Sequence, residues 1–253
     1  VEQERFLTVS VHKKNVDEAR TFFSRVTGEV SSKLSRLNSS SNELDAAERL
    51  DVLRGFFRPD EAALPFDLQS AMKRGHNLKD TICPDSLEFH RDYFKMGNQY
   101  GRVLFLKDYA SYIKDSMILE LTDLNRRMML SIDMIPVPTD EAVREVENKL
   151  LGVETNVTNW QRRQNSNQNF SAVVPYDLEQ QRKETREMLD DLTTRDQRML
   201  FAVVTLVHLA DSKEELDSDT ETLQSIARKH LCQLAKLSFQ QQDGLVTALP
   251  LGL

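Results

Sequence analysis

Binding of a nucleoside triphosphate by a P-loop requires glycines at fixed spacing before Lys-Ser or Lys-Thr, because backbone N–H groups must crowd around the phosphates. The chain has only eight glycines in 253 residues. They are scattered at positions 28, 55, 75, 97, 101, 152, 244 and 252, and no stretch matches the pattern. The sequence therefore predicts no P-loop and no cofactor-binding residue in these 253 residues.

Metal ligands follow characteristic spacings, such as HxxxH or HExxH on one helical face and CxxC for paired thiolates. The two cysteines, Cys83 and Cys232, lie far apart, and the five histidines are dispersed at positions 12, 76, 90, 208 and 230. We expect no metal site, and this cysteine usage favours a reducing compartment. His208 lies in the most apolar segment, so we expect a buried neutral imidazole hydrogen-bonded to a neighbour.

Nucleophiles and paired carboxylates are the remaining routes to catalysis. The chain has no GxSxG motif, the usual setting of an exposed catalytic serine. Its acidic stretches at 186–191 and 213–221 are typical of solvated helix surfaces. We therefore predict no catalytic residue, although a carboxylate pair brought together by folding stays open.

The composition indicates a folded, globular chain, with 40% hydrophobic and 29% charged residues. A formal charge of −7 works against binding of nucleic-acid phosphates. The longest apolar stretch, 199–210, is too short to span a bilayer as a helix, which takes about 20 residues. We expect both ends, Val1 and Leu253, to be boundaries cut from a longer chain.

The N-terminal part is expected to be a β-α-α lobe with a connector, over residues 1–84. Alternation at 6–11 predicts a strand, and apolar residues at three- and four-residue steps predict a helix over 15–37. A second helix should run to 57, capped by Ser41 or Asn42. Residues 58–84 contain three prolines and no sustained periodicity, which predicts a connector with one helical turn.

The remainder, 85–253, is expected to alternate strands and helices. The pattern predicts a half-exposed strand in 85–94 and a turn at Gly97-Asn98. Further strands are expected at 101–109, 128–137, 198–210 and 232–239, with helices at 111–124, 140–163, 177–193 and 212–230. This order predicts an α+β fold with a ferredoxin-like β-α-β, helical hairpin, β-α-β plan, in which 140–193 is an insertion.

One helix of the insertion carries a heptad stripe that needs a partner helix. Its members step by three and four residues: Val143, Val146, Leu150, Val153, Val157 and Trp160. The helix at 177–193 offers a looser stripe, and a polar loop at 164–175 allows an antiparallel return. We favour this internal hairpin over a coiled coil between molecules, because loop closure costs little. The stripe is thus a candidate helix-packing or interface seam.

A family resemblance is carried by four segments in order: YFKMGNQYGRVLFLKDYASYI (93–113), MLSIDMIPVPTDEA (129–142), RMLFAVVTLVHLADSKEELDSDTETL (198–223) and QQQDGLVTALPLG (240–252). There the chain resembles the N-terminal region of the CagE/TrbE/VirB family. These are the large ATPases of type IV secretion and conjugative transfer, here of the Gram-positive conjugative-element type. The resemblance is clearest over 86–253. Ala110 stands where the family usually has Pro, and Leu245 where many relatives have an aromatic residue.

The resemblance implies a non-catalytic assembly and docking domain of a conjugative type IV secretion ATPase. Its implied partners are the membrane channel and ATPase subunits at the cytoplasmic face of the bacterial membrane. Self-association stays open, and the negative charge predicts no direct contact with nucleic acid. ATP and Mg²⁺ are implied only for a RecA-like domain beyond TALPLGL (247–253), and no ATP-site residue of the family maps onto this chain. The alternative is a self-contained sensor or enzyme for a small ligand, which would require a concave pocket with convergent polar groups.

Overall fold

The computed structural model describes residues 3–59, 67–75, 77, 79, 82–110, 112–167 and 173–251. The chain divides into two compact units. The first combines residues 1–131 with 204–253, and the second is the continuous stretch 132–203. Parts of the predicted connector 58–84 and of the predicted loop 164–175 lie outside the described residues. The predicted domain boundary at residue 84 stays a prediction.

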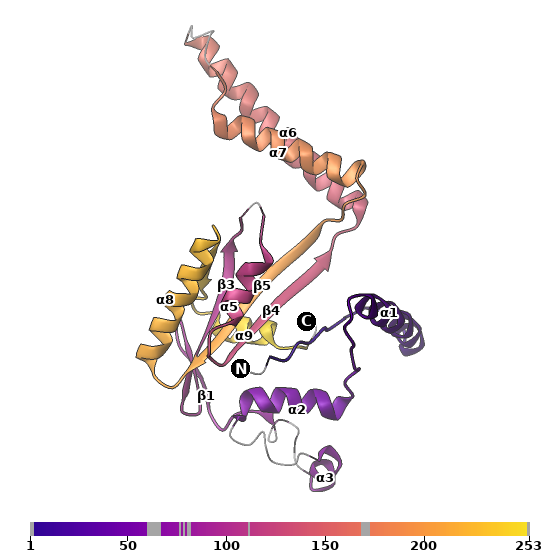
Figure 1. Ribbon diagram of the computed structural model, residues 1–253. Helices are drawn as coiled ribbons and strands as arrows, with labels where there is room; N and C mark the ends of the chain where they lie inside the picture. The colour runs from indigo at the N-terminus through magenta and orange to yellow at the C-terminus, as the bar shows by residue number, and fades with distance from the viewer. Residues whose placement is uncertain are drawn as a thin grey trace. The chain divides into compact units, whose positions relative to one another are not determined.

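The fold is mixed α/β, as the sequence predicts at that level, with eight helices among the described residues (Figure 1). The helices are α1 (Val16–Arg36), α2 (Ala46–Phe57), α3 (Leu68–Lys73), α5 (Asp115–Thr122), α6 (Thr139–Ser166), α7 (Tyr176–Thr193), α8 (Lys213–Lys229) and α9 (Gln241–Ala248). The strands are β1 (Leu87–Phe89), β2 (Phe94–Met96), β3 (Gln99–Asp108), β4 (Met128–Pro136), β5 (Leu200–Ala210) and β6 (Gln233–Lys236). None of the described helices is long and apolar enough to cross a membrane.

The predicted strand at 6–11 is wrong, because these residues form neither helix nor strand. An alternating pattern becomes a strand only where a neighbouring strand accepts its backbone hydrogen bonds, and the described sheet contains no partner for 6–11.

The two helices that follow, α1 and α2, are present. Asn15 caps α1 by accepting a bond from the N–H of Glu18 at 2.8 Å. The cap of α2 is Asp45, not Ser41 or Asn42, because only Asp45 forms a capping box with Glu48.

The predicted strand in 85–94 is two strands, β1 and β2, joined by a tight turn. The N–H of His90 donates to the carbonyl of Tyr93 at 2.9 Å, which folds β2 back antiparallel onto β1. Alternation alone did not reveal this turn, because the chain reverses without a glycine. The predicted turn at Gly97-Asn98 is confirmed, and Gly97 adopts a positive φ of 57° there.

Six strands form one open sheet in the order β1-β2-β3-β5-β4, with β6 pairing to the same edge of β3 as β2. The pairs of β3 with β2, β5 and β6 are all antiparallel. Val103 lies opposite Val207 and Leu104 opposite Leu206, so the apolar residues of the two central strands share faces. The predicted strand 232–239 is shorter, because the residues after Lys236 lead into α9.

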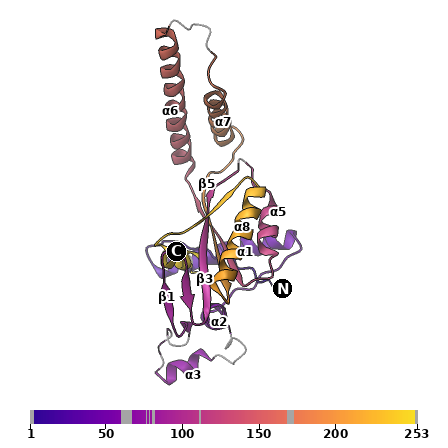
Figure 2. The same ribbon diagram turned by 90° about the vertical axis from the view of Figure 1, so that its left-hand side faces the viewer.

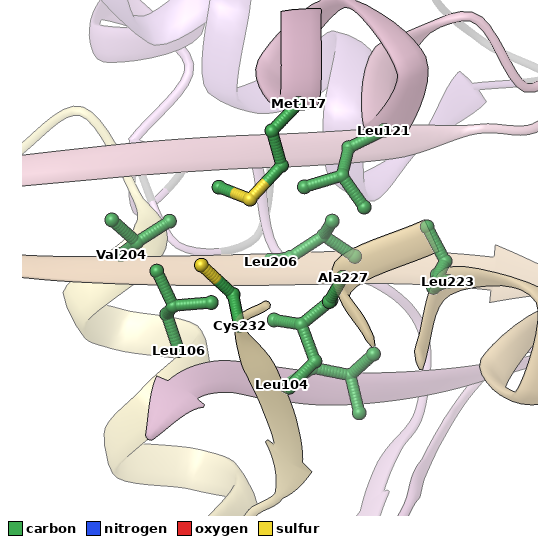
Figure 3. Packing of buried hydrophobic residues seen from close by; sticks show 10 residues of the cluster. Leu104, Leu106, Met117, Leu121, Val204, Leu206, Leu223, Ala227 and Cys232 are labelled. Carbon is green, nitrogen blue, oxygen red and sulfur yellow. The ribbon is translucent and has the colours of Figure 1, made fainter. Parts of the chain in front are cut away.

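Helices cover both faces of the sheet within the first unit. On one face, α5 and α8 lie side by side (Figure 2). Figure 3 shows Met117 and Leu121 pointing from α5 toward Leu206 on β5, with Leu223 and Ala227 contributed by α8. On the other face, α9 and the end of α2 pack over a second cluster that contains Phe94, Met96, Val103, Val207 and Leu209. Helix α5 begins at Asp115 rather than at the predicted 111, which lies outside the described residues.

Two glycines permit close packing at this second cluster. A Cβ on Gly101 would overlap the ring of Phe94, which is fully buried. A Cβ on Gly244 in α9 would overlap side-chain atoms of Leu237 and lie 2.8 Å from Cγ1 of Val103. Helix α9 therefore approaches β3 closely only because position 244 lacks a side chain.

The second unit contains the hairpin of α6 and α7 and the residues of β4 and β5 that lead into and out of it. The predicted helices 140–163 and 177–193 are both present, as 139–166 and 176–193. Ala142 and Val146 of α6 pack against Leu192 of α7. Glu154 of α6 also pairs with Arg186 of α7, with 2.5 Å between carboxylate and guanidinium atoms.

Candidate functional site

The most polar part of the sheet interior is a cluster centred on Arg102 of β3. Arg102 and His208 are directly opposite each other in the β3–β5 ladder, so both side chains reach the face covered by α8. Thr220 of α8 lies over them, and all three residues have no exposed surface. A fully buried arginine is rare unless it is paired, so its partners decide what this cluster can do.

The guanidinium of Arg102 is held from several sides. Its Nη1 donates to the hydroxyl of Thr220 at 2.7 Å, and its Nε donates to the carbonyl of Asp92 at 2.9 Å. Its Nη2 lies 2.8 Å from Oδ1 of Asp217 on α8 and 3.5 Å from Oδ2 of Asp92. The pairing with Arg102, chiefly by a side-chain hydrogen bond, lowers the pKa of Asp217. Arg102 thereby ties the β1–β2 hairpin loop, β3 and α8 together.

The hydrogen bonds of Thr220 determine the state of His208. The Thr220 hydroxyl has one proton and donates it to the carbonyl of Leu216 at 2.7 Å. His208 Nε2, 3.1 Å from the same oxygen, must therefore carry the proton in this pair. Nδ1 is then the unprotonated nitrogen, and it is buried without a hydrogen-bond partner among the described residues.

A neutral His208 also follows from its electrostatics. Burial, and next the positive charges of Arg102 and Lys236, lower its pKa to about 4. The expectation of a buried, neutral, hydrogen-bonded imidazole is therefore confirmed. Such a group cannot act as a base toward a solvent-borne substrate while the cluster stays closed, so the arrangement is structural.

Sequence reasoning missed Arg102. The available signal was a single arginine between glycine and an apolar run in GRVLFL (101–106), inside a strand that is buried on both faces. A charge at such a position needs a partner. The sequence did not reveal the partner, because Asp217 lies 115 residues after Arg102 in the chain.

The described residues offer little for metal or ligand chemistry. They contain no group of three or more His, Cys, Asp or Glu side chains that could hold a metal ion. A hollow of about 630 Å³ on the surface of the N-terminal segment opens to solvent. It is lined by Lys13, Asn15, Asp17, Glu18, Thr21, Phe22 and Arg25. Its charged groups are exposed, so it lacks the desolvated polar groups of an enclosed ligand site.

The predicted seam faces α7 over part of its length. Val146, Val153 and Val157 are buried, whereas Val143, Leu150 and Trp160 are half-buried. The next residue along the helix, Leu151, is 68% exposed. The internal partner that the sequence favours is thus in place, and use of the seam by a second molecule stays the untested alternative.

A two-stranded segment among the described residues departs from ordinary packing, and we call it the apolar ribbon: residues 132–136 of β4 and 200–203 of β5. The ladder continues past it, since the N–H of Val137 donates to the carbonyl of Met199 at 3.0 Å. Six large apolar side chains of the ribbon are between 41% and 63% exposed: Ile132, Met134, Ile135, Leu200, Phe201 and Val203.

These six side chains occupy both faces of the ribbon, because successive residues of a strand alternate in direction. Ile132, Met134 and Leu200 lie on one face, and Ile135, Phe201 and Val203 on the other. Extended clusters of exposed apolar residues commonly mark sites of protein or membrane contact. Among the described residues, the ribbon is therefore our candidate docking surface.

Comparisons with known proteins add no assignment to these surfaces. No protein-family model matches the chain, and a search of curated proteins returns no significant match.

Proposed function

We propose that the chain is a non-catalytic docking domain of a conjugative type IV secretion ATPase of the CagE/TrbE/VirB kind. In this role it would contact channel components at the cytoplasmic face of the membrane as a peripheral protein. The proposal combines the resemblance of segments 93–113, 129–142, 198–223 and 240–252 with the surface described above. ATP and Mg²⁺ would then act on a separate RecA-like domain.

The proposal includes a ferredoxin-like core. Its support is the strand order β6-β3-β5-β4 together with the chain order β3, α5, β4, β5, α8, β6. Each helix-containing connection would then join two strands separated by a third, with α5 and α8 on one face. The α6–α7 hairpin would be an insertion between the second and third strands of this core.

The observation that carries the docking role is the apolar ribbon. Apolar residues on both faces of a strand are typical of strands buried on both sides. In the ribbon they face solvent, and they stabilise the isolated chain little. A surface of this kind is best explained by a partner that covers it. The alternative of a small-ligand sensor or enzyme lacks an enclosed polar pocket among the residues that the structure describes.

The experiment is gene replacement in the host, with DNA transfer to a recipient as the readout. The double variant Met134→Asp/Phe201→Asp places one charge on each face of the ribbon. We expect transfer to fall at least about tenfold, the effect of losing about 1.4 kcal/mol of binding free energy when transfer is proportional to the docked fraction. The control, Leu151→Asp/Tyr176→Asp, changes two residues of the hairpin that are 68% and 78% exposed and should transfer normally.

Equal transfer by both variants, at equal protein levels in immunoblots, would contradict the docking role. ATP turnover by the purified chain above a buffer blank would contradict its non-catalytic character. The reading frame after residue 253 tests the family, since the proposal requires a GxxxxGK[ST] motif there.

A further inference from the structure

Helix α1 carries a second apolar stripe, whose members range from half-buried to exposed. Its apolar residues recur at three- and four-residue steps, yet no residue of the helix is buried. The members of this stripe are Val16, Ala19, Phe23, Val26, Val30, Leu34 and Leu37. Val16 is 66% exposed and Phe23 is 39% exposed. A single helix with this pattern gains most of its stability by packing the stripe against another surface.

The α1 segment and the ribbon unit carry opposite net charges. Residues 3–37 contain seven Lys and Arg against four Asp and Glu, a net charge of +3. Residues 132–203 contain nine Lys and Arg against 13 Asp and Glu, a net charge of −4. Opposite net charges favour the encounter of these two regions, and the like charge of two identical regions disfavours their pairing. Salt screens both effects beyond about 8 Å at 0.15 M. Helix α1 itself has four Lys and Arg against three Asp and Glu, a net charge of +1, and the ribbon has one charged residue, Asp133. The charges of the two surfaces are thus opposite but small, and the match between them is chiefly apolar.

We propose that two copies of the chain form a dimer in which α1 of each copy packs its apolar stripe against the apolar ribbon of the other. The inference rests on the proposed docking role of the ribbon and names its partner. The contact is made twice about a two-fold axis, as in most homodimers.

The exposed area is consistent with a reciprocal dimer. One ribbon face presents three side chains that are about half exposed, or roughly 300 Å² if each carries on the order of 200 Å². A matching area of α1 brings each contact to roughly 600 Å², and two contacts reach roughly 1,200 Å², the lower limit of specific interfaces. A dimer held by one contact alone should therefore dissociate at much higher protein concentrations than the wild-type dimer.

The test is sedimentation velocity of the full chain over a range of concentrations. The wild-type chain should sediment as a dimer. Phe23→Asp should dissociate it by charging the helix stripe, and Met134→Asp/Phe201→Asp should do so by charging the ribbon. Val16→Asp is a second helix variant, chosen because Asp in the first turn favours a helix. Each change should raise the dimer dissociation constant at least tenfold, with an unchanged far-UV circular dichroism spectrum.

Mixing the two classes of variant gives the decisive result. Phe23→Asp retains an intact ribbon, and Met134→Asp/Phe201→Asp retains an intact helix, so their heterodimer keeps one of the two contacts. An equimolar mixture should therefore associate more tightly than either variant alone and more weakly than the wild type. The controls Ser24→Asp, on the polar face of α1, and Leu151→Asp/Tyr176→Asp should remain dimers like the wild type.

Three outcomes would overturn the proposal: a wild-type monomer at every concentration, a Phe23→Asp dimer as tight as the wild type, or a mixture of folded variants that associates no more tightly than either variant alone. Failure here is separable from failure of the docking role. A monomeric wild type whose ribbon variant still loses DNA transfer would leave the docking role intact and exclude self-association.

Discussion

Strand β5 passes through two contrasting environments. Its residues 204–210 are buried, with Leu206 and Val207 completely inaccessible under helices on both faces. Its residues 200–203 are equally apolar, yet they are exposed in the ribbon. Leu200 and Leu206 even share a face, because they are separated by an even number of positions. The difference lies entirely in what covers the strand.

This contrast separates two uses of the same residue types. Where α5, α8 and α9 cover the sheet, apolar side chains stabilise the fold, and the buried Arg102 is paired with carboxylates. Where no helix covers it, the same pattern contributes little to stability and remains available to a partner. An apolar run therefore predicts that its residues are covered. It does not predict whether the covering surface belongs to the same molecule or to a partner.

The largest expected effect tests this contrast directly. Leu206→Ala should lower the free energy of unfolding by about 2–5 kcal/mol, because it leaves a cavity in a closed cluster. Leu200→Ala, on the same strand and face, should change it by less than about 0.5 kcal/mol. Urea denaturation of both variants measures the difference, and comparable losses would mean that the ribbon is packed in the monomer.

The pH dependence of stability tests the covered region through His208. Its pKa of about 4 lies below the ordinary value of 6.5, so between these pH values the unfolded chain binds a proton that the folded chain does not. Stability should therefore decline as the pH falls from about 6.5 to 4, by at most about 3 kcal/mol from this residue. His208→Gln should flatten that part of the profile in urea titrations. If stability depends on pH equally steeply in the variant and the wild type, another residue causes the decline.

Removal of one charge partner should have a smaller effect. Asp217→Asn should lower the free energy of unfolding by about 2 kcal/mol, because buried Arg102 keeps only the weaker pairing with Asp92. Since the pKa of Asp217 is lowered, its contribution is present above its ordinary pKa of 3.8 and is lost as the pH falls through the lower folded-state value. The variant should thus match the wild type more closely in strong acid. Thermal unfolding at pH 7 and pH 3 makes this comparison.

The smallest effect concerns neighbouring residues of α6. Leu150→Asp charges a half-buried position of the seam and should lower the stability of the hairpin by about 1 kcal/mol. Leu151→Asp charges the exposed neighbour and should have no measurable effect. Hydrogen exchange of α6 and α7 amides reports on this unit separately. If Leu150→Asp instead dissociates a dimer without increasing exchange, the seam is an intermolecular contact.

The sequence predicted the elements well where a local rule decided them. Helices α6, α7 and α8 were found within a few residues because their apolar stripes continue for several turns, and strands β3, β4 and β5 because their apolar runs are long. The strand at 6–11 failed because a strand depends on a partner elsewhere in the chain. The division between β1 and β2 failed because a backbone hydrogen bond from His90, rather than a glycine, makes the turn.

By itself, the sequence determined that no P-loop, CxxC or HExxH chemistry is encoded in these residues, that α6 needs a helical partner, and that His208 would be buried and neutral. Only the tertiary structure decided that Arg102 meets Thr220 and Asp217, and that the apolar residues of 132–136 and 200–203 face solvent. The physical reason is that periodicity records which face of an element is apolar. What covers that face is decided by contacts between residues far apart in the chain, and those contacts leave no local pattern.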